Sequence, residues 1–169
     1  MCSSDLNDTG AYESLLDEAA MLPTQMLLWH YRSKHEYLIA FSNAKIYQGN
    51  LITFPSSVEK ADGMGVEYIH VVGGTYERGG KNGNKKEAAR IAELVFDHFQ
   101  KYPNRSLGII AFGEVQQTSI EEAIIRKRHD NPQYEIFFKE DKEEPLFIKN
   151  LETVQGDERD TIIFSIGYA

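Results

Sequence analysis

Four consecutive ionisable side chains, Asp157-Glu158-Arg159-Asp160, stand directly before the apolar residues 161–166. The apolar run is typical of a strand buried on both faces. Three carboxylates within four positions could hold a divalent metal ion, so a metal-dependent nuclease-like domain is one hypothesis. A solvated turn is the more common structure for such a run, and a nuclease also needs a catalytic lysine on an adjacent strand. We therefore assign no metal ligands.

A second candidate is the segment GGTYERGGKNGN, residues 73–84, which holds five of the 13 glycines. Glycine-rich loops can cradle phosphate groups, but the P-loop needs Gly-x-x-x-x-Gly-Lys followed by Ser or Thr. Here Thr75 stands five residues before Gly80, and Asn82 follows Lys81. No dinucleotide-binding fingerprint fits either. The segment is predicted to be a mobile loop.

A third candidate is Arg32, which the pattern places between the end of a strand and the start of a helix. Sites in parallel sheets lie beyond the carboxyl ends of strands, so this is a position where a binding residue is expected. Spacing alone favours a surface ion pair. His30 and His35 have no Cys or carboxylate partner at metal-ligand spacing, so they are not predicted to bind metal.

These residues must be positioned by alternating helices and strands. Apolar positions at helical spacing predict helices over residues 11–20, 34–47, 85–102 and 115–130. Strands are predicted within residues 26–33, 66–72, 107–112, 145–150 and 161–168, with residues 131–145 ambiguous. Ser33 with Glu36, and Asn84 with Glu87, have the spacing of capping boxes. The fold class is α/β, with a mostly parallel sheet covered by helices on both faces.

The composition is that of a soluble globular domain of 169 residues, 41% hydrophobic and 26% charged. A net charge of -8 argues against a whole-surface basic footprint, although it leaves room for a local basic patch. Cys2 is the single cysteine, which excludes an internal disulfide. No apolar run approaches the roughly 18 residues that a membrane helix needs. A cytoplasmic location is therefore expected.

Four segments together resemble a known family. The family is the superfamily I helicases, in the branch of the nonsense-mediated-decay helicase. The first segment, LLWHYRSKH at residues 27–35, resembles the family's Leu-x-x-Gln-Tyr-Arg-Met-His-Pro. It is followed by IYQGNL at residues 46–51, which resembles the family's Phe-Tyr-x-Gly-x-Leu. Residues 151–160, LETVQGDERD, resemble the family's Val-Asp-x-x-Gln-Gly-x-Glu-x-Asp signature. Residues 84–88 and 108–117 resemble its Asn-x-x-Glu-Ala helix start and its strand-loop-Gln element. The order is that of the family, and the segments cover most of the chain.

This resemblance implies a RecA-like domain of the P-loop NTPase type, the second of the two motor domains between which ATP and Mg²⁺ bind. It implies that residues 11–169 form a partial domain, incomplete at its C-terminal end. The polar composition of residues 1–10 separately predicts a frayed tail. The Mg²⁺ ligands are expected in the first domain, so the isolated chain is not expected to hydrolyse ATP. The implied partners are that first domain and single-stranded nucleic acid, with DNA favoured over RNA.

The resemblance also implies roles for individual residues. Arg32 would stabilise charge on the transferring phosphate, as an arginine finger does. Nucleotide contacts would come from Tyr31 at the adenine and from Glu158 at the ribose. Gln155 with Gly156 would also belong to the nucleotide site and would shape the loop that joins nucleotide to nucleic acid. Gln116 and Asn150 would face the nucleic acid.

Several positions depart from the family pattern. His30 stands in place of Gln, Glu152 in place of Asp, and Asp157 where Arg is frequent. Ala111 stands where relatives have a backbone-contacting threonine. Two other classes stay open from the residues alone: a non-catalytic α/β interaction module, and the metal-dependent nuclease-like domain.

Overall fold

The computed structural model describes residues 14–55, 63–76 and 83–168, and the predicted tail over residues 1–10 lies outside them. The chain divides into two compact units, Met1–Tyr68 and Ile69–Ala169.

The N-terminal unit contains short elements joined by long connections. Its helices are α1 (Leu15–Glu18), the 3₁₀ helix η1 (Ala19–Met21) and α2 (Tyr37–Lys45). Its strands β1 (Trp29–His30) and β2 (Ile52–Thr53) pair in parallel. The Asn43 side chain ties α2 to the start of β2, because it bonds both the N–H and the carbonyl of Leu51, at 3.0 and 3.1 Å.

The C-terminal unit is built on a three-stranded parallel sheet. Its elements in chain order are α3 (Lys85–Lys101), β3 (Leu107–Ala111), α4 (Glu114–Asp130), the 3₁₀ helix η2 (Pro132–Phe138), β4 (Phe147–Asn150) and β5 (Thr161–Ser165). The strand order is β4-β3-β5, so β3 lies in the centre and all five of its residues are buried. The prediction of a parallel α/β sheet is confirmed.

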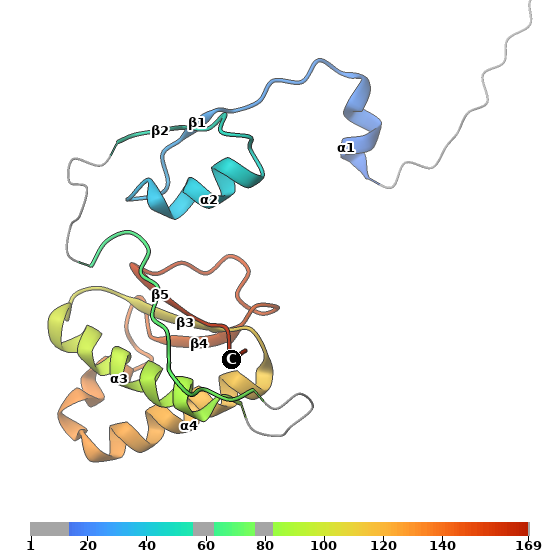
Figure 1. The fold of residues 1–169 in the computed structure, drawn as a ribbon. Coiled ribbons are helices and arrows are strands. Elements are labelled where there is room, and N and C mark those ends of the chain that lie inside the picture. Colours follow the sequence, from blue (N-terminus) through green and yellow to red (C-terminus); the bar gives the residue numbers. More distant parts are fainter. Residues whose placement is uncertain (1–13, 56–62, 77–82, 169) are drawn as a thin grey trace, which may run out of the picture. The chain divides into compact units, whose positions relative to one another are not determined.

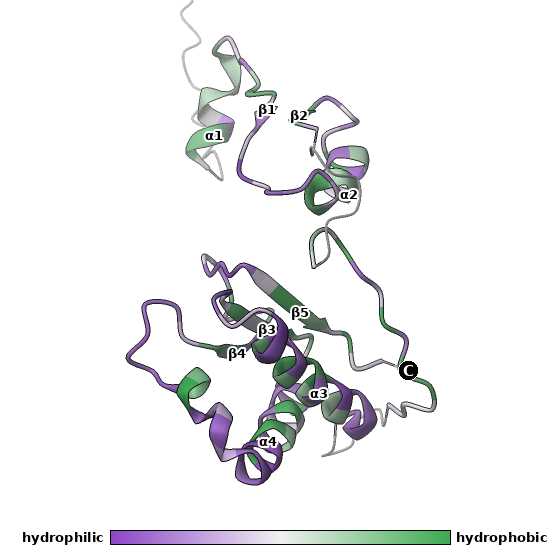
Figure 2. Cartoon of the chain, turned by 90° about the vertical axis from the view of Figure 1, so that its left-hand side faces the viewer, coloured by the Kyte–Doolittle hydropathy of each residue, from purple (hydrophilic) through white to green (hydrophobic). Residues whose placement is uncertain are grey.

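Helices α3 and α4 lie on the same side of this sheet (Figure 1). The strands are largely hydrophobic along their length, whereas both helices mix hydrophobic and hydrophilic residues, as surface helices do (Figure 2). The core between the helices and the sheet consists of Ala88, Ile91, Ala92, Val95, Phe96, Phe99, Leu107, Ile109, Ala111, Ile120, Ala123 and Ile124.

The opposite side of the sheet carries the connection from β4 to β5, residues 151–160, which we call the crossover segment (Figure 1). Strands β4 and β5 lie on either side of β3 and run parallel to it. The crossover segment must therefore return from the carboxyl end of β4 to the amino end of β5. Right-handed connections place this return on the face opposite α4. The helical layer predicted for this face is not found within the described part of the unit.

One predicted strand is absent, and two predicted helices differ in extent. Residues 66–72 are not a strand, because they pair with no neighbour among the described residues and Val66, Tyr68 and Val72 are strongly exposed. Helix α2 is shorter than predicted, starting at Tyr37 with no side-chain cap, because Ser33 bonds His30 instead of capping it. The helix expected over residues 11–20 is reduced to α1 and η1 in its described part.

Candidate functional site

A buried polar network joins the start of α3 to the start of α4 and the end of β5. Its members are Asn84, Glu87, Gln116 and Ser165. Gln116 Oε1 accepts the backbone N–H of Asn84 at 2.7 Å, and Gln116 Nε2 donates to Ser165 Oγ at 3.0 Å. Gln116 is only 6% exposed, so its amide is occupied inside the protein. The predicted contact between Gln116 and nucleic acid stays a prediction.

Glu87 completes this polar network. Its carboxylate accepts the Ser165 hydroxyl at 2.7 Å and the backbone N–H of Gly167 at 3.1 Å. Asn84 caps α3, since its Oδ1 accepts the Glu87 N–H at 3.1 Å. The capping-box prediction is therefore half correct, because Gln116 rather than Glu87 bonds the backbone N–H of Asn84. The result is a fixed junction between segments more than 30 residues apart in the sequence.

Two glycines let the preceding loop approach this junction. A Cβ at Gly83 would lie 2.8 Å from Ser119 Oγ, and a Cβ at Gly74 would lie 2.6 Å from Asn84 Nδ2. The Gly83 N–H also donates to Ser119 Oγ at 3.1 Å. Part of the predicted mobile loop is therefore packed against α3 and α4, while residues 77–82 lie outside the described residues.

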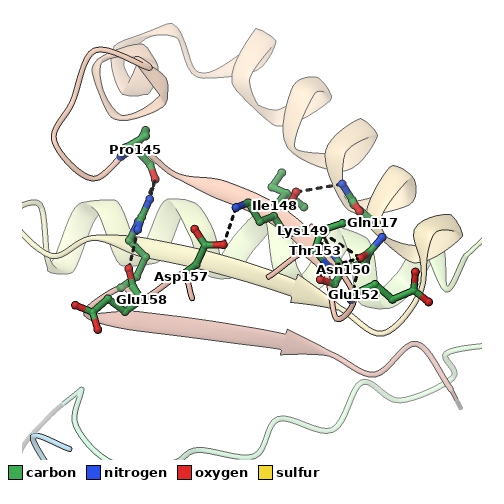
Figure 3. Close-up of polar contacts among 10 residues, drawn as sticks. Gln117, Pro145, Ile148, Lys149, Asn150, Glu152, Thr153, Asp157 and Glu158 are labelled. Carbon is green, nitrogen blue, oxygen red and sulfur yellow. Dashed lines mark hydrogen bonds and ion pairs between the residues drawn. The ribbon is translucent and has the colours of Figure 1, made fainter. Parts of the chain in front are cut away.

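Asn150 lies at the carboxyl end of β4 and organises the turn that follows. Its Oδ1 accepts the backbone N–H groups of Glu152 and Thr153, both at 3.1 Å (Figure 3). This is the bonding of an Asx turn, which holds the chain where it leaves the strand. Asn150 is 7% exposed, and its predicted contact with nucleic acid is not tested by this geometry.

Gln155, Gly156 and Glu158 lie in the crossover segment and are exposed. Gly156 has φ +90°, a conformation that favours glycine and reverses the chain direction there. Glu158 lies near the amino end of β5, at the opposite end of the strands from Asn150 (Figure 3). The acidic run is therefore not at the carboxyl edge of the sheet, where Gln116 and Asn150 lie.

Contacts with β4 hold the crossover segment in place. Asp157 Oδ2 accepts Lys149 Nζ at 2.6 Å, in a pair that is about one-third exposed or less (Figure 3). The Arg159 guanidinium donates to the Pro145 carbonyl at 2.8 and 3.1 Å and lies 4.9 Å from the centre of the Phe147 ring. This segment thus has a defined conformation despite its lack of helix or strand.

The carboxylates of the acidic run serve different partners. Asp157 pairs with Lys149, whereas Asp160 Oδ2 accepts the backbone N–H of Ser106 at 3.1 Å. Among the described residues, no three His, Cys, Asp or Glu side chains converge in a way that could hold a metal ion. This arrangement does not favour the nuclease-like hypothesis.

Tyr31 and Arg32 follow directly after β1 in the N-terminal unit, and both are exposed. Next to them, His30 Nε2 and Ser33 Oγ lie 2.7 Å apart, and the Ser33 N–H donates to the same ring nitrogen at 3.2 Å. These bonds fix the turn that carries Arg32. The position just beyond the carboxyl end of a parallel strand is the one predicted for Arg32.

The polar network as a unit was not predicted from the sequence. Ser165 had no local signal, because a single serine in an apolar strand looks like any tolerated small residue. Asn84 and Glu87 had a local signal in their capping-box spacing, but that spacing indicates only the start of a helix. Gln116 was singled out through the family resemblance, without its buried partners.

Comparison with known proteins identifies the family. A family model described as an AAA domain matches residues 8–167, which is nearly the whole chain. The chain belongs to this AAA domain family. The AAA domain is 38% identical over 152 residues to a protein named uncharacterized ATP-dependent helicase MG140 from Mycoplasma genitalium. It is 36% identical over 147 residues to the homolog from Mycoplasma pneumoniae.

The two alignments each cover 85% of this AAA domain and 13% of the relative. The chain therefore spans about an eighth of the length of the curated relatives it matches. No solved structure matches it. Within the described residues, no helix is long and apolar enough to cross a membrane.

Proposed function

We propose that this chain is the second motor domain of an ATP-dependent nucleic-acid helicase or translocase. The observation that carries the proposal is the match of residues 8–167 to the AAA domain family, together with relatives that are named ATP-dependent helicases. The α/β fold with a parallel sheet is consistent with it. The chain would act with a first motor domain of the same protein, at whose interface ATP and Mg²⁺ bind.

In this proposal Arg32 supplies charge to the phosphoryl-transfer transition state. Arg32 is exposed and stands directly after the end of β1, on a turn fixed by His30 and Ser33. An arginine supplied to a transferring phosphate is worth roughly 10³ to 10⁵ in rate. A lysine lacks the planar fork that binds two phosphate oxygens at once.

Other exposed residues would complete the nucleotide contacts. Tyr31 would stack near the adenine, and the Glu158 carboxylate would accept hydrogen bonds from the ribose hydroxyls. Gln155 and Gly156 are exposed in the crossover segment, which suits a loop that touches a ligand. Nucleic acid, with DNA favoured over RNA, would lie at the carboxyl edge of the sheet near Gln116 and Asn150.

The test is the steady-state ATPase rate of the full-length protein with Arg32→Ala, beside a titration of ATP binding. We expect turnover to fall by about 10³-fold or more. ATP affinity should stay within a few-fold, because the interaction is realised mainly in the transition state. Arg90→Ala is a matched control, since Arg90 forms an exposed ion pair with Glu93 on α3.

Unchanged turnover of Arg32→Ala would mean that Arg32 only forms a surface ion pair. The isolated chain provides a baseline, because we expect no hydrolysis without the first domain. A non-catalytic interaction module would show no ATP-dependent behaviour in either form. Metal-dependent cleavage of nucleic acid by the isolated chain would instead favour the nuclease-like domain.

A further inference from the structure

Two exposed tyrosines form a ring pair beside the start of α3. The centroids of the Tyr76 and Tyr168 rings are 4.6 Å apart, with 68° between the ring planes. Tyr76 is 46% exposed and Tyr168 is 58% exposed. Rings that serve only to fill a core are buried, so this pair keeps a large aromatic surface in contact with solvent.

The backbone beneath both rings is held by the polar network. Gly167, next to Tyr168, is buried, donates its N–H to Glu87 and accepts Asn84 Nδ2 at 3.4 Å through its carbonyl. Gly74, two residues before Tyr76, lies against the same Asn84 side chain. Both tyrosines are thus fixed relative to one anchor. A prearranged aromatic surface binds a ligand at a lower cost in conformational entropy.

Positive charge lies beside the segment that leads to Tyr76. Lys85 and Lys86 are the first two residues of α3 and are exposed. The Lys86 ammonium lies 2.8 Å from the position that a Cβ would take at Gly73, in the segment that leads to Tyr76. The nearby Glu87 carboxylate is engaged with Ser165 and Gly167. In a chain of net charge -8, this is a local basic area.

We propose that Tyr76 and Tyr168 form a stacking platform for a base of single-stranded nucleic acid, with Lys85 and Lys86 neutralising the adjacent phosphates. Aromatic side chains beside cationic ones are how proteins bind single strands without reading their sequence. The choice of nucleic acid as the ligand depends on the motor-domain function proposed above. The platform itself depends only on the ring pair, its exposure and its anchor.

The experiment compares the 169-residue chain with its Tyr168→Ala and Tyr76→Ala variants at low salt, where phosphate binding is strongest. The probes are a fluorescent dT oligonucleotide and an abasic strand of the same length and charge. Removing one stacked ring should weaken dT binding by about 5- to 150-fold. Abasic-strand binding should not change, because that strand has phosphates but no bases to stack.

Two further variants make the result specific. Tyr168→Phe should bind dT like the unaltered chain, because a phenyl ring stacks as a phenol does. Tyr68→Ala removes another exposed tyrosine and should have no effect. Circular dichroism identifies a variant that has lost its fold. If both alanine variants unfold, dT-induced shifts of the assigned Tyr76 and Tyr168 ring protons in the unaltered chain decide the question.

Several outcomes would overturn the platform. Equal losses on dT and on the abasic strand would show a loss of structure or charge rather than of stacking. An alanine variant that binds dT normally, or rings that respond to ATP and not to dT, would also refute it. Absence of any dT binding would remove the platform as well. None of these outcomes affects the motor-domain function, which the ATPase rate of Arg32→Ala tests separately.

Discussion

Replacing Glu87 by alanine is the sharpest test of the polar network. Glu87→Ala removes the acceptor of the Ser165 hydroxyl and of the Gly167 N–H. Ser165 is fully buried, so no water can replace the lost carboxylate without a rearrangement. The helix cap itself is kept, because Asn84 Oδ1 accepts a backbone N–H that alanine also provides.

The magnitude follows from these bonds. A hydrogen bond to a charged group contributes about 1.5 to 3 kcal/mol, and an unsatisfied buried donor costs about 1 to 3 kcal/mol. The two bonds share one carboxylate, so their contributions are not additive. We expect Glu87→Ala to lower the free energy of unfolding of the C-terminal unit by about 2 to 4 kcal/mol.

The assay is urea unfolding followed by far-UV circular dichroism, because α3 and α4 carry most of the helix in the chain. Tryptophan fluorescence would follow the wrong unit, since the single tryptophan, Trp29, lies in the N-terminal one. Glu93→Ala is the matched control. It removes a glutamate from the same helix whose ion pair with Arg90 is exposed, and should change the free energy by no more than about 0.5 kcal/mol.

Equal small losses for Glu87→Ala and Glu93→Ala would refute this reasoning, because they would mean that the network adds nothing beyond surface charge. The double variant Glu87→Ala with Ser165→Ala gives a second check. If the two residues stabilise each other, the double variant should lose less than the sum of the single losses.

Three further perturbations test other parts of the unit. Gly108→Ala should lower the free energy of unfolding by about 1 to 3 kcal/mol, because the added methyl would overlap the Phe147 ring. In Gly113→Ala the added methyl meets no atom, so the free energy of unfolding should fall by about 1 kcal/mol or less. Urea unfolding measures both variants. Burial lowers the pKa of His98, whose Nε2 donates to the Arg105 carbonyl. The neutral imidazole therefore stabilises the fold fully above the unfolded-state pKa of about 6.5, and this stabilisation declines as the pH falls below that value. His98→Gln should therefore reduce the loss of stability between about pH 7.5 and pH 5.5. Asn150→Ala should lower the midpoint of unfolding by removing the acceptor of the Asx turn, at a cost of about 1 to 2 kcal/mol.

The elements that the sequence predicts best are those whose periodicity is long and unbroken. Helix α3 has 17 residues with a regular apolar stripe and an Asn84 cap, and the structure confirms it almost to the residue. The apolar runs of β3 and β5 are equally clear. A strand buried at the centre of a parallel sheet tolerates few polar residues, and this explains the run of β3. Strand β5 was expected to be buried on both faces, but it lies at the edge of the described sheet and Phe164 is 59% exposed. These elements define the fold class without further information.

The failures have a different physical origin. Residues 66–72 have β-branched and aromatic residues, yet a strand also needs an edge to pair with, which propensity cannot reveal. The Ser33 cap was lost to a competing local bond with His30. The direction of the crossover segment depends on strand order, which the sequence does not state.

The candidate site was predictable only in part. The exposure of Arg32 beyond β1 follows from its place between a strand and a helix. The buried state of Gln116 does not, because its partners Ser165 and Asn84 come from segments 49 and 32 residues away. Such partners become visible only when the strands are assembled.

The central position of β3 also has a consequence for synthesis on the ribosome. Its partners lie on both sides, but β4 and β5 follow it in the chain by about 40 and 54 residues. Until residues 161–165 emerge, one edge of the apolar strand Leu107–Ala111 has no backbone partner, and such an edge can pair with another chain. Nascent chains stalled before β5 emerges should therefore aggregate, and the emergence of Ser165 and Gly167 is the step that closes this edge and locks it to α3.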